Sequence, residues 1–413
     1  MKKILLITLA VVLILVGGIW LYLFIFGAPE SSQELFADLG FGSSPAPTEF
    51  TNDFIREDFP IEEVETGIDS NKALNLLTLR PVAGATIVGT STDKQVVRYV
   101  ERGTGQIYEI DLANNNETLL SDAAIAQATQ ATWSNNGNLV VIESGNSTNP
   151  QVQLLTWHEN TASGTNTQGQ FIATDIAPDA FGFAFSEDNK NLFYLRTDGD
   201  GSLGYSYPVA TNKPTVTFTL PFISPAVEWG SRPLIYNRPG EQQTGYAYRL
   251  VGGELESAGK GGEALVAKAF YNDGAILSTV HDGLLKGTYY SDSDTFEVAL
   301  AALPEKCASG SNESYQMFCA YPFEQSGDLP TNWYKGTVNL QDYLWSIDID
   351  PTSPNRGVAS LVSDFTSEAG VTIDVIDMST DYTKTRLLFT DKHTNALWMY
   401  DTALRNTANT IPN

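Results

Sequence analysis

A short phrase recurs seven times between Ser91 and the C-terminus, and it constrains the fold more than any other feature of the chain. Each copy has an aromatic or apolar residue, a tight polar turn and then a run of alternating apolar residues. The turn serines or their equivalents stand at positions 91, 134, 186, 230, 271, 309 and 379. Most intervals are about 40–50 residues, the length of a four-stranded propeller blade. The step from the sixth copy to the seventh is about 70 residues and therefore holds an insertion.

The third copy indicates how each blade is built. Short β-branched and aromatic runs alternate with turns rich in Asp, Asn, Gly and Pro, a pattern typical of β-strands. From the inner strand outward, the four runs are 181–185, 191–196, 203–207 and 215–220. No apolar pattern of helical period follows the N-terminal segment, so little helix is expected there. The chain is therefore predicted to be all-β, a seven-bladed β-propeller of four-stranded antiparallel blades.

The last copy ends early, which suggests how the ring closes. After residues 396–400 only 401–413 remain, and these contain little strand signal. The apolar run 74–79 precedes the first copy and has no place in the first blade. We expect this run to join the last blade, because closure removes an exposed sheet edge. The predicted propeller then spans residues 71–405, and residues 406–413 form a C-terminal tail.

The first 28 residues predict a membrane anchor. Residues 4–26 form an uncharged apolar run, and a helix of that length, at about 1.5 Å per residue, crosses a hydrocarbon core of about 30 Å. A cleaved signal peptide is the alternative, but its apolar stretch is usually only about 7–15 residues. Lys2 and Lys3 precede the run, so the positive-inside rule predicts a cytoplasmic N-terminus. We expect residues 1–28 to form a single-pass transmembrane helix in the cell membrane, with the propeller extracytoplasmic.

Residues 29–70 differ in composition from the rest and are predicted to be an acidic linker. They hold eleven acidic residues against the single basic residue Arg56, and a Ser- and Pro-containing stretch at 42–48 is typical of a spacer. A solvated linker that holds the propeller away from the bilayer explains this composition. The alternative is a short docking segment that folds on a basic partner, because apolar residues interleave with the acids at Phe50, Phe54, Ile55, Phe59 and Ile61.

The charge of the chain excludes one class of partner. The formal net charge is −25 at pH 7, with 49 acidic residues against 24 basic ones. Nucleic-acid binding needs clustered Lys and Arg, so no nucleic-acid partner is expected. An anionic membrane surface would also repel the propeller, which leaves the N-terminal helix as the membrane contact.

The chain has two cysteines, Cys307 and Cys319, which flank the turn of the sixth copy. A close pair outside the cytosol is most simply a disulfide that clamps a hairpin. Two buried free thiols or a metal site are the alternatives. The metal site is the weaker one, since zinc needs about four ligands and no His or Cys cluster accompanies the pair. No bound metal is expected.

Two sets of residues resemble known propellers. The turn phrase, an aromatic residue before Ser-x-x-Gly or Ser-x-Asp-Asn and then an apolar strand, resembles the WD40-like repeats of TolB-type propellers. That resemblance implies an architecture and no activity. In the sixth copy, Cys307, 319–322, 329–336 and 342–345 are similar to a group of uncharacterised bacterial, single-pass, membrane-anchored propellers with the same cysteine-and-tryptophan insert. Ala308 replaces the aromatic residue usual in that group, for which no activity is assigned.

Catalytic signatures are weak in this sequence. The three histidines, His158, His281 and His393, fall in different copies, and no Gly-x-Ser-x-Gly elbow is present, so a Ser-His-Asp unit is not expected. Residues 259–262 lack the spacing of a phosphate loop and are predicted to connect two blades. Residues 198–201 imitate the start of a calcium loop but lack its later ligands, which favours a hairpin turn. No cofactor is expected.

Two sets of aromatic residues are candidates for binding. One set stands at equivalent inner-strand positions: Trp133, Phe185, Trp229 and Phe270. Its regular spacing favours packing between blades over an aromatic ligand cage. The other set lies in the insertion: Trp333, Tyr334, Tyr343 and Trp345. Departures from a repeat often lie on a binding face, and interfaces favour Trp and Tyr, although these residues could instead cover the insertion's own small core.

These features favour binding over catalysis. We expect a protein-binding scaffold at the cell surface that uses one propeller face and the insertion to hold a protein partner outside the cytoplasm. One alternative is an enzyme that acts on glycans through paired carboxylates, and another is a small-ligand sensor. Converging acids with a raised pKa in a cleft would favour the enzyme, whereas an exposed aromatic patch would favour the scaffold.

Overall fold

The computed structural model describes residues 64–404, except for 90–94, 122–124, 147–148, 160–168, 187, 238–242, 271–273, 302, 310–314, 326–328 and 382. The predicted anchor, almost all of the predicted linker and the C-terminal tail therefore lie outside the described residues. Within the described part of the chain, no helix has the length and apolar character needed to cross a membrane.

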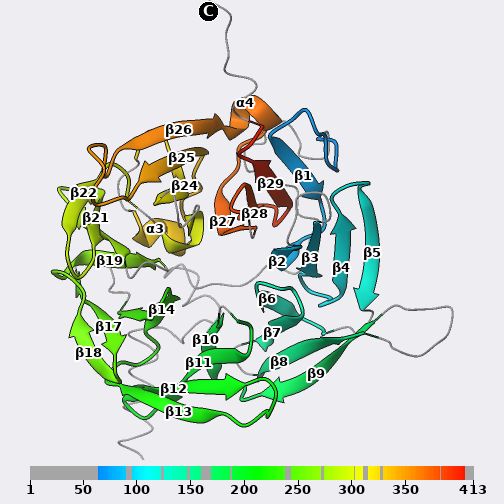
Figure 1. Ribbon diagram of the computed structural model, residues 1–413, viewed down its shortest axis with the longest axis horizontal. Helices are drawn as coiled ribbons and strands as arrows, with labels where there is room; N and C mark the ends of the chain where they lie inside the picture. Colours follow the sequence, from blue (N-terminus) through cyan, green and yellow to red (C-terminus); the bar gives the residue numbers. More distant parts are fainter. Residues whose placement is uncertain are drawn as a thin grey trace, which may run out of the picture. The chain divides into compact units, whose positions relative to one another are not determined.

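Seven sheets stand around a common centre, each with one strand next to the centre and the others farther out (Figure 1). Blade 1 contains β2 (Val82–Val88), β3 (Val96–Glu101), β4 (Ile107–Asp111) and β5 (Asn116–Ser121). Blade 2 contains β6 (Ala128–Trp133), β7 (Leu139–Asn146), β8 (Asn149–His158) and β9 (Gln170–Ile176). Blade 3 contains β10 (Ala180–Phe185), β11 (Asn191–Asp198), β12 (Gly201–Pro208) and β13 (Thr215–Leu220), in close agreement with its predicted strands.

The next three blades follow in chain order. Blade 4 contains β14 (Ala226–Trp229), β15 (Pro233–Tyr236), β17 (Ala247–Val251) and β18 (Glu254–Ser257). Blade 5 contains β19 (Gly262–Ala269), β20 (Ala275–His281), β21 (Leu284–Tyr290) and β22 (Thr295–Val298), and the short β16 (Thr244–Gly245) pairs with β19. Blade 6 contains β23 (Cys307–Ser309), β24 (Gln316–Pro322), β25 (Asp342–Asp348) and β26 (Ala359–Asp364).

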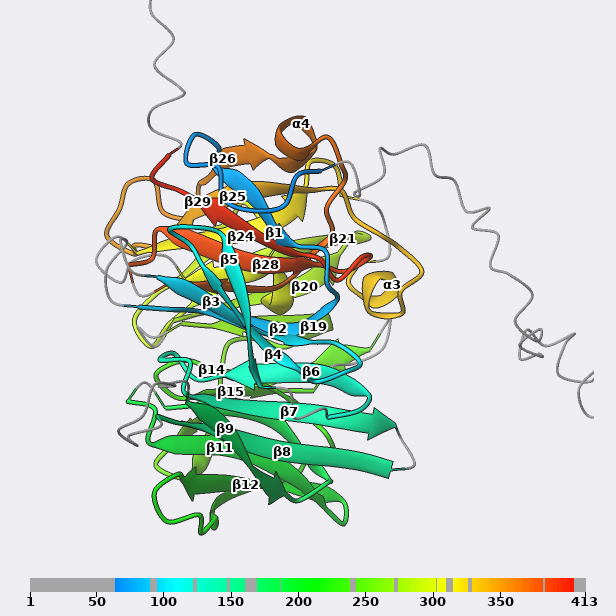
Figure 2. The ribbon, with the colours of Figure 1, turned by 90° about the vertical axis from the view of Figure 1, so that its right-hand side faces the viewer.

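Blade 7 joins the two ends of the propeller, as predicted. Its strands β27 (Val375–Thr380), β28 (Arg386–Asp391) and β29 (Leu397–Asp401) are completed by β1 (Leu74–Thr78). β1 runs antiparallel to β29 along the outer edge of the blade. All the blade pairings are antiparallel, so the predicted all-β, seven-bladed propeller is confirmed (Figure 2).

The segment before β1 is fastened to blade 1. The backbone N–H of Ile68 donates to the side-chain oxygen of Asn115 at 2.7 Å, and the Asn115 amide donates back to the Ile68 carbonyl at 3.1 Å. The N–H of Gly67 donates to the Leu76 carbonyl at 2.8 Å. The two hydrogen bonds between Ile68 and Asn115, which we call the Ile68–Asn115 clasp, lie immediately N-terminal to β1, the strand that closes the ring.

The repeated phrase is a turn in which one side chain caps the next strand. In blade 2 the Ser134 hydroxyl accepts a hydrogen bond from the Leu139 N–H at 3.0 Å. In blade 3 the Ser186 hydroxyl accepts one from the Asn191 N–H at 2.9 Å. Short polar side chains that bond nearby backbone in this way favour tight turns. In these two turns the serine hydroxyl accepts from the first N–H of the next strand, and in blade 7 Asp381 accepts from the Arg386 N–H in the same way.

Apolar residues fill the space between neighbouring blades. The indole N–H of Trp133 donates to the Gly84 carbonyl of the preceding blade at 3.1 Å, and that of Trp229 donates to the Gly182 carbonyl at 3.2 Å. A Cβ on Gly84 would lie 2.0 Å from the carbonyl oxygen of Ala131, so glycine permits this close approach. The predicted packing role of these inner-strand aromatics is confirmed for both tryptophans.

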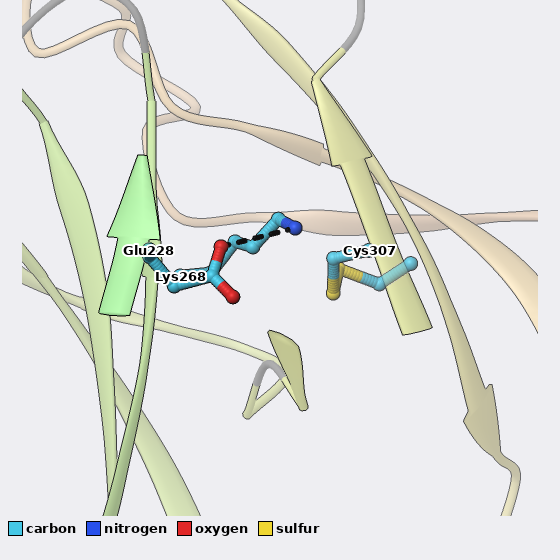
Figure 3. The surroundings of a disulfide bond; sticks show 4 residues. Glu228, Lys268 and Cys307 are labelled. Carbon is cyan, nitrogen blue, oxygen red and sulfur yellow. Dashed lines mark ion pairs between the residues drawn. A yellow bond between two sulfur atoms is a disulfide. The ribbon is translucent and has the colours of Figure 1, made fainter. Parts of the chain in front are cut away.

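Blade 6 carries the disulfide and the insertion. Cys307 and Cys319 face each other in the β23–β24 pair and are bonded, as predicted (Figure 3). The connection from β24 to β25 contains the short helix α3 (Thr331–Tyr334). A second short helix, α4 (Phe365–Ala369), follows β26, is capped by Asp364 and ends at Gly370 in the left-handed region. In Figure 2, α3 lies on the same face of the propeller as the end of β7 and the start of β8.

Candidate functional site

The structure separates the four predicted binding aromatics into two pairs. Trp333 is 2% exposed and packs in a core cluster with Leu329 and Leu340. Tyr334 packs against the same cluster, and its hydroxyl donates to Glu305 at 2.9 Å. This pair is therefore packed into a core cluster that the insertion shares with blades 4 and 5.

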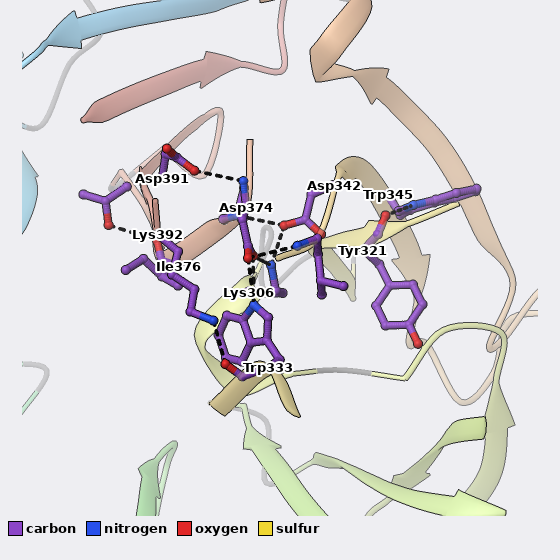
Figure 4. Close-up of polar contacts among 12 residues, drawn as sticks. Lys306, Tyr321, Trp333, Asp342, Trp345, Asp374, Ile376, Asp391 and Lys392 are labelled. Carbon is purple, nitrogen blue, oxygen red and sulfur yellow. Dashed lines mark hydrogen bonds and ion pairs between the residues drawn. The ribbon is translucent and has the colours of Figure 1, made fainter. Parts of the chain in front are cut away.

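The second pair belongs to a partly exposed group that we call the aromatic cluster: Phe323, Tyr343 and Trp345. Phe323 is 66% exposed, and its ring centroid lies 5.7 Å from that of Tyr343 and 6.1 Å from that of Trp345. Trp345 lies opposite Cys319 in the β24–β25 pair and donates its indole N–H to the Tyr321 carbonyl at 3.1 Å (Figure 4). The cluster therefore has a rigid support with one large ring left in solvent.

Beneath the insertion lies a fully buried charged network (Figure 4). The Lys306 ammonium has no solvent exposure, contacts Asp342 and lies 2.6 Å from a carboxylate oxygen of Asp374. Burial raises the pKa of Asp342 to about 6, with the nearby Asp374 adding to the rise and Lys306 opposing it. Three elements meet in this network: the short 3-10 helix Pro304–Lys306 that leads into β23, the start of β25 and the residue before β27.

The network also holds α3 in place. The Trp333 indole N–H donates to the Asp374 carboxylate oxygens at 2.9 and 3.1 Å. The Lys306 and Lys392 ammonium groups lie 4.9 and 4.1 Å from the Trp333 ring centroid, and Lys392 donates to the Trp333 carbonyl at 2.6 Å. Cation–π contacts of desolvated lysines add to these hydrogen bonds. We interpret the network as the fastening of the insertion, because its carboxylates bind Lys306, the Trp333 indole and the Val375 N–H, while Asp342 Oδ1 is buried without a partner among the described residues.

A second polar group gathers at the centre of the ring. Glu228 on β14 and Lys268 on β19 form an ion pair at 3.3 Å (Figure 3). Asp377 on β27 adopts a positive φ of 54° beside a register shift, which turns this residue out of the regular pleat. Its side chain is exposed; the surrounding blades and the charge of Glu305 raise its pKa, and Arg102 and Lys268 oppose the rise.

The remaining chemistry-bearing residues lie apart. His158, His281 and His393 stand on blades 2, 5 and 7, so each histidine belongs to a different blade, as the sequence repeats predict. In the described residues, no group of three or more His, Cys, Asp or Glu side chains has an arrangement suited to a metal ion. Residues 198–201 form the hairpin turn between β11 and β12, and residues 259–261 connect blade 4 to blade 5, both as predicted.

Sequence reasoning missed Phe323, Asp377 and the Lys306 network. Phe323 directly follows the Cys319–Pro322 stretch, so its position in the sequence next to the insertion could have identified it as a candidate binding residue. Asp377 and Lys306 carried no such signal, since their surroundings come from blades distant in the sequence.

Comparisons with known proteins agree with the fold. No protein family matches the chain, and no curated protein matches it. Oligogalacturonate lyase from Vibrio parahaemolyticus superimposes with a TM-score of 0.52 at 10% identity, over 82% of this chain and 96% of that one. TolB from Acinetobacter baumannii superimposes with a TM-score of 0.38 at 12% identity, over 66% of each chain. At 10% identity the likeness to the lyase concerns the fold alone, and it agrees with the seven-bladed β-propeller of this chain.

Proposed function

We propose that the protein is a membrane-anchored, extracytoplasmic propeller that binds a protein partner through the aromatic cluster of blade 6. In this proposal residues 1–28 are the transmembrane anchor and residues 29–70 set the distance of the propeller from the bilayer. The Cys307–Cys319 disulfide supports the compartment, because disulfides form and persist outside the reducing cytosol.

The observation that carries the proposal is the position of Phe323. A phenylalanine that is 66% exposed leaves a large apolar ring in water, and its neighbours Tyr343 and Trp345 extend the same aromatic surface. Exposed apolar groups gathered in this way mark interaction sites, and aromatic anchors supply much of the binding energy at interfaces. The disulfide and the buried Lys306 network hold the support rigid, which lowers the entropic cost of binding.

Charge indicates the chemistry of the partner. Glu324 next to Phe323 is exposed, and the whole chain has a net charge of −25. A partner with a pocket for the aromatic ring and a basic rim around it would complement this surface. Such complementarity raises the association rate at low salt, so the association should weaken as ionic strength rises.

Crosslinking in cells tests this proposal. The full-length protein is crosslinked in its membrane, and the captured proteins are identified by mass spectrometry. We expect one reproducible partner that is lost in Phe323→Ala and kept in Ile223→Ala, which removes another exposed apolar side chain (59% exposed) far along the chain from the cluster. Capture that survives Phe323→Ala unchanged, or no reproducible partner at all, would overturn the proposal.

A second candidate function, a glycan-acting enzyme, is favoured by Asp377. Asp377 is an exposed carboxyl group at the centre of the ring, and the charge of a second acid, Glu305, helps to raise its pKa; paired carboxyl groups are the usual catalytic groups for glycosidic cleavage. The test is the cleavage of soluble polysaccharides by the full-length protein and by Asp377→Asn. Cleavage that disappears in Asp377→Asn would establish the enzyme, and a wild type without cleavage would remove this candidate.

A further inference from the structure

A cavity of about 540 Å³ lies between blades 3 and 4, on other blades than the aromatic cluster. Four of its thirteen lining residues are aromatic: Phe185 and Phe193 from blade 3, the buried Phe218 from the outer strand of that blade, and Trp229 from blade 4. The Trp229 and Phe193 rings are stacked, with centroids 5.1 Å apart and planes 21° apart. A volume of this size is typical of small-molecule sites.

The cavity arises from a mismatch between the two blades. The strands of blade 3 have 6, 8, 8 and 6 residues, whereas those of blade 4 have 4, 4, 5 and 4. The shorter blade cannot cover the full face of the longer one, so aromatic rings that would otherwise be buried between blades line an opening. Phe185, Phe193 and Trp229 are partly buried, as is Trp133 between blades 1 and 2.

The interface between blades 1 and 2 shows how the same position is filled elsewhere in the ring. Trp133 there is the counterpart of Trp229, because both donate to a glycine carbonyl of the preceding blade. Arg98 is the counterpart of Phe193, since each lies two residues before a core residue that packs on the next blade, Val100 or Leu195. The Arg98 guanidinium donates to the Gly137 carbonyl at 2.9 Å and lies 5.0 Å from the Trp157 ring centroid. Arg98 therefore lies in the blade 1–2 interface against Trp157, which stands on β8.

The rim of the cavity is polar but carries no carboxylate among the described residues. Ser206, Thr217 and Ser231 contribute hydroxyl groups. Arg232 contributes a guanidinium that keeps a 3.4 Å pair with Asp292, which is 66% exposed. In a chain with 49 acidic residues, a lining of aromatic rings, hydroxyls and one guanidinium favours a neutral, flat ligand that is apolar on its faces and hydroxylated at its edges.

We propose that this cavity is a carbohydrate-binding site that takes one or more neutral sugar rings of an oligosaccharide. The apolar C–H face of a sugar stacks on a partly exposed Trp or Phe ring, while its hydroxyl groups exchange hydrogen bonds with Ser, Thr and Arg side chains. The described lining supplies no acid or base for glycosidic cleavage, which normally requires a pair of carboxyl groups. The site therefore holds the sugar without cleaving it, and it is independent of the protein-binding surface on blade 6.

The test uses the full-length protein in a detergent without a sugar headgroup, labelled with 5-fluorotryptophan. Its seven tryptophans give separate ¹⁹F signals, and the signal missing in Trp229→Phe identifies Trp229. Cellopentaose, chitopentaose and maltopentaose are titrated in turn. We expect at least one of them to shift the Trp229 signal saturably, with a Kd of about 1 mM or tighter.

Two variants and one control decide the outcome. Phe193→Arg places at this position the residue found in the blade 1–2 interface, so it should fill the cavity and weaken binding at least tenfold with the fold retained. Trp229→Ala should also weaken binding at least tenfold. Trp133→Ala changes the counterpart tryptophan in the blade 1–2 interface and should leave the affinity unchanged. Absence of binding by all three saccharides, or binding that persists in Phe193→Arg and Trp229→Ala, would overturn the proposal.

Discussion

Leu76 of β1 lies directly opposite Trp398 of β29, so the first and last strands of the propeller share one blade. Both side chains are 1% exposed and belong to a core cluster shared by blades 6 and 7. Packing between side chains therefore reinforces the backbone hydrogen bonds that hold the ring closed.

Replacing Leu76 with alanine should lower the free energy of unfolding by about 2–5 kcal/mol, because the change removes buried methyl groups and leaves a cavity. Chemical denaturation followed by tryptophan fluorescence measures the loss. Leu79→Ala is the matched control: Leu79 is 40% exposed, and the same truncation there should alter stability by no more than about 0.5 kcal/mol. Equal losses in the two variants would contradict a closing role for β1.

Removing the disulfide should lower the free energy of unfolding by about 3 kcal/mol, the value that chain entropy gives for so short a loop. Cys307 and Cys319 are 12 positions apart. Denaturation curves of the wild type with and without a reductant measure the loss. A double variant, Cys307→Ala with Cys319→Ala, should already have the lower stability, and the reductant should not change it further. A wild type that is equally stable with and without the reductant would refute the prediction.

Asp374→Ala should destabilise the protein by about 3–5 kcal/mol, because Lys306 then remains buried with one of its two carboxylate partners gone. The Trp333 indole loses its acceptor in the same variant, so the insertion around α3 should also become sensitive to limited proteolysis. Asp188→Ala serves as the control, since its pair with Lys190 is exposed and worth about 0–1 kcal/mol. Unchanged proteolysis of the insertion in Asp374→Ala would show that the network does not hold it.

Glu143 on β7 should make the protein less stable as the pH rises. Burial raises its pKa from 4.5 to about 7, so the folded chain binds this proton more tightly than the unfolded chain. The resulting stabilisation is fully present below pH 4.5 and is lost as the pH rises through 7.

The neutral variant Glu143→Gln should therefore match the wild type near pH 4 and exceed it at pH 8. The gain should be at most about 3 kcal/mol, and less to the extent that the side chain keeps water contact. Denaturation curves across this pH range measure the difference. Glu254→Gln, at an exposed position, should follow the wild type throughout, and a constant offset for Glu143→Gln would contradict the assignment.

Local patterns were enough to predict the blades. The four strands of blade 3 followed from alternating apolar residues and turn residues, both of which act within a few positions of the chain. The role of β1 followed from counting strands, because a missing outer strand in the last blade had to be supplied from elsewhere. The disulfide followed from two cysteines on either side of one hairpin.

The candidate site was harder to predict because its environment is assembled from distant segments. Trp333 looks like an exposed anchor in the sequence, yet Lys306 and Asp374 from either side of the insertion converge on its ring and bury it. Phe185 and Trp229 fit a repeating packing pattern, but the shorter strands of blade 4 leave them lining a cavity. Side-chain exposure here depends on the relative size of neighbouring blades, which no local pattern records.

The position of β1 also has a mechanical consequence. Tension applied to the chain through residues 1–63 would reach the propeller first at the Ile68–Asn115 clasp and then at the pairing between β1 and β29. The strand that seals the ring would therefore also bear the load: once the clasp to blade 1 is released, pulling β1 free would open blade 7.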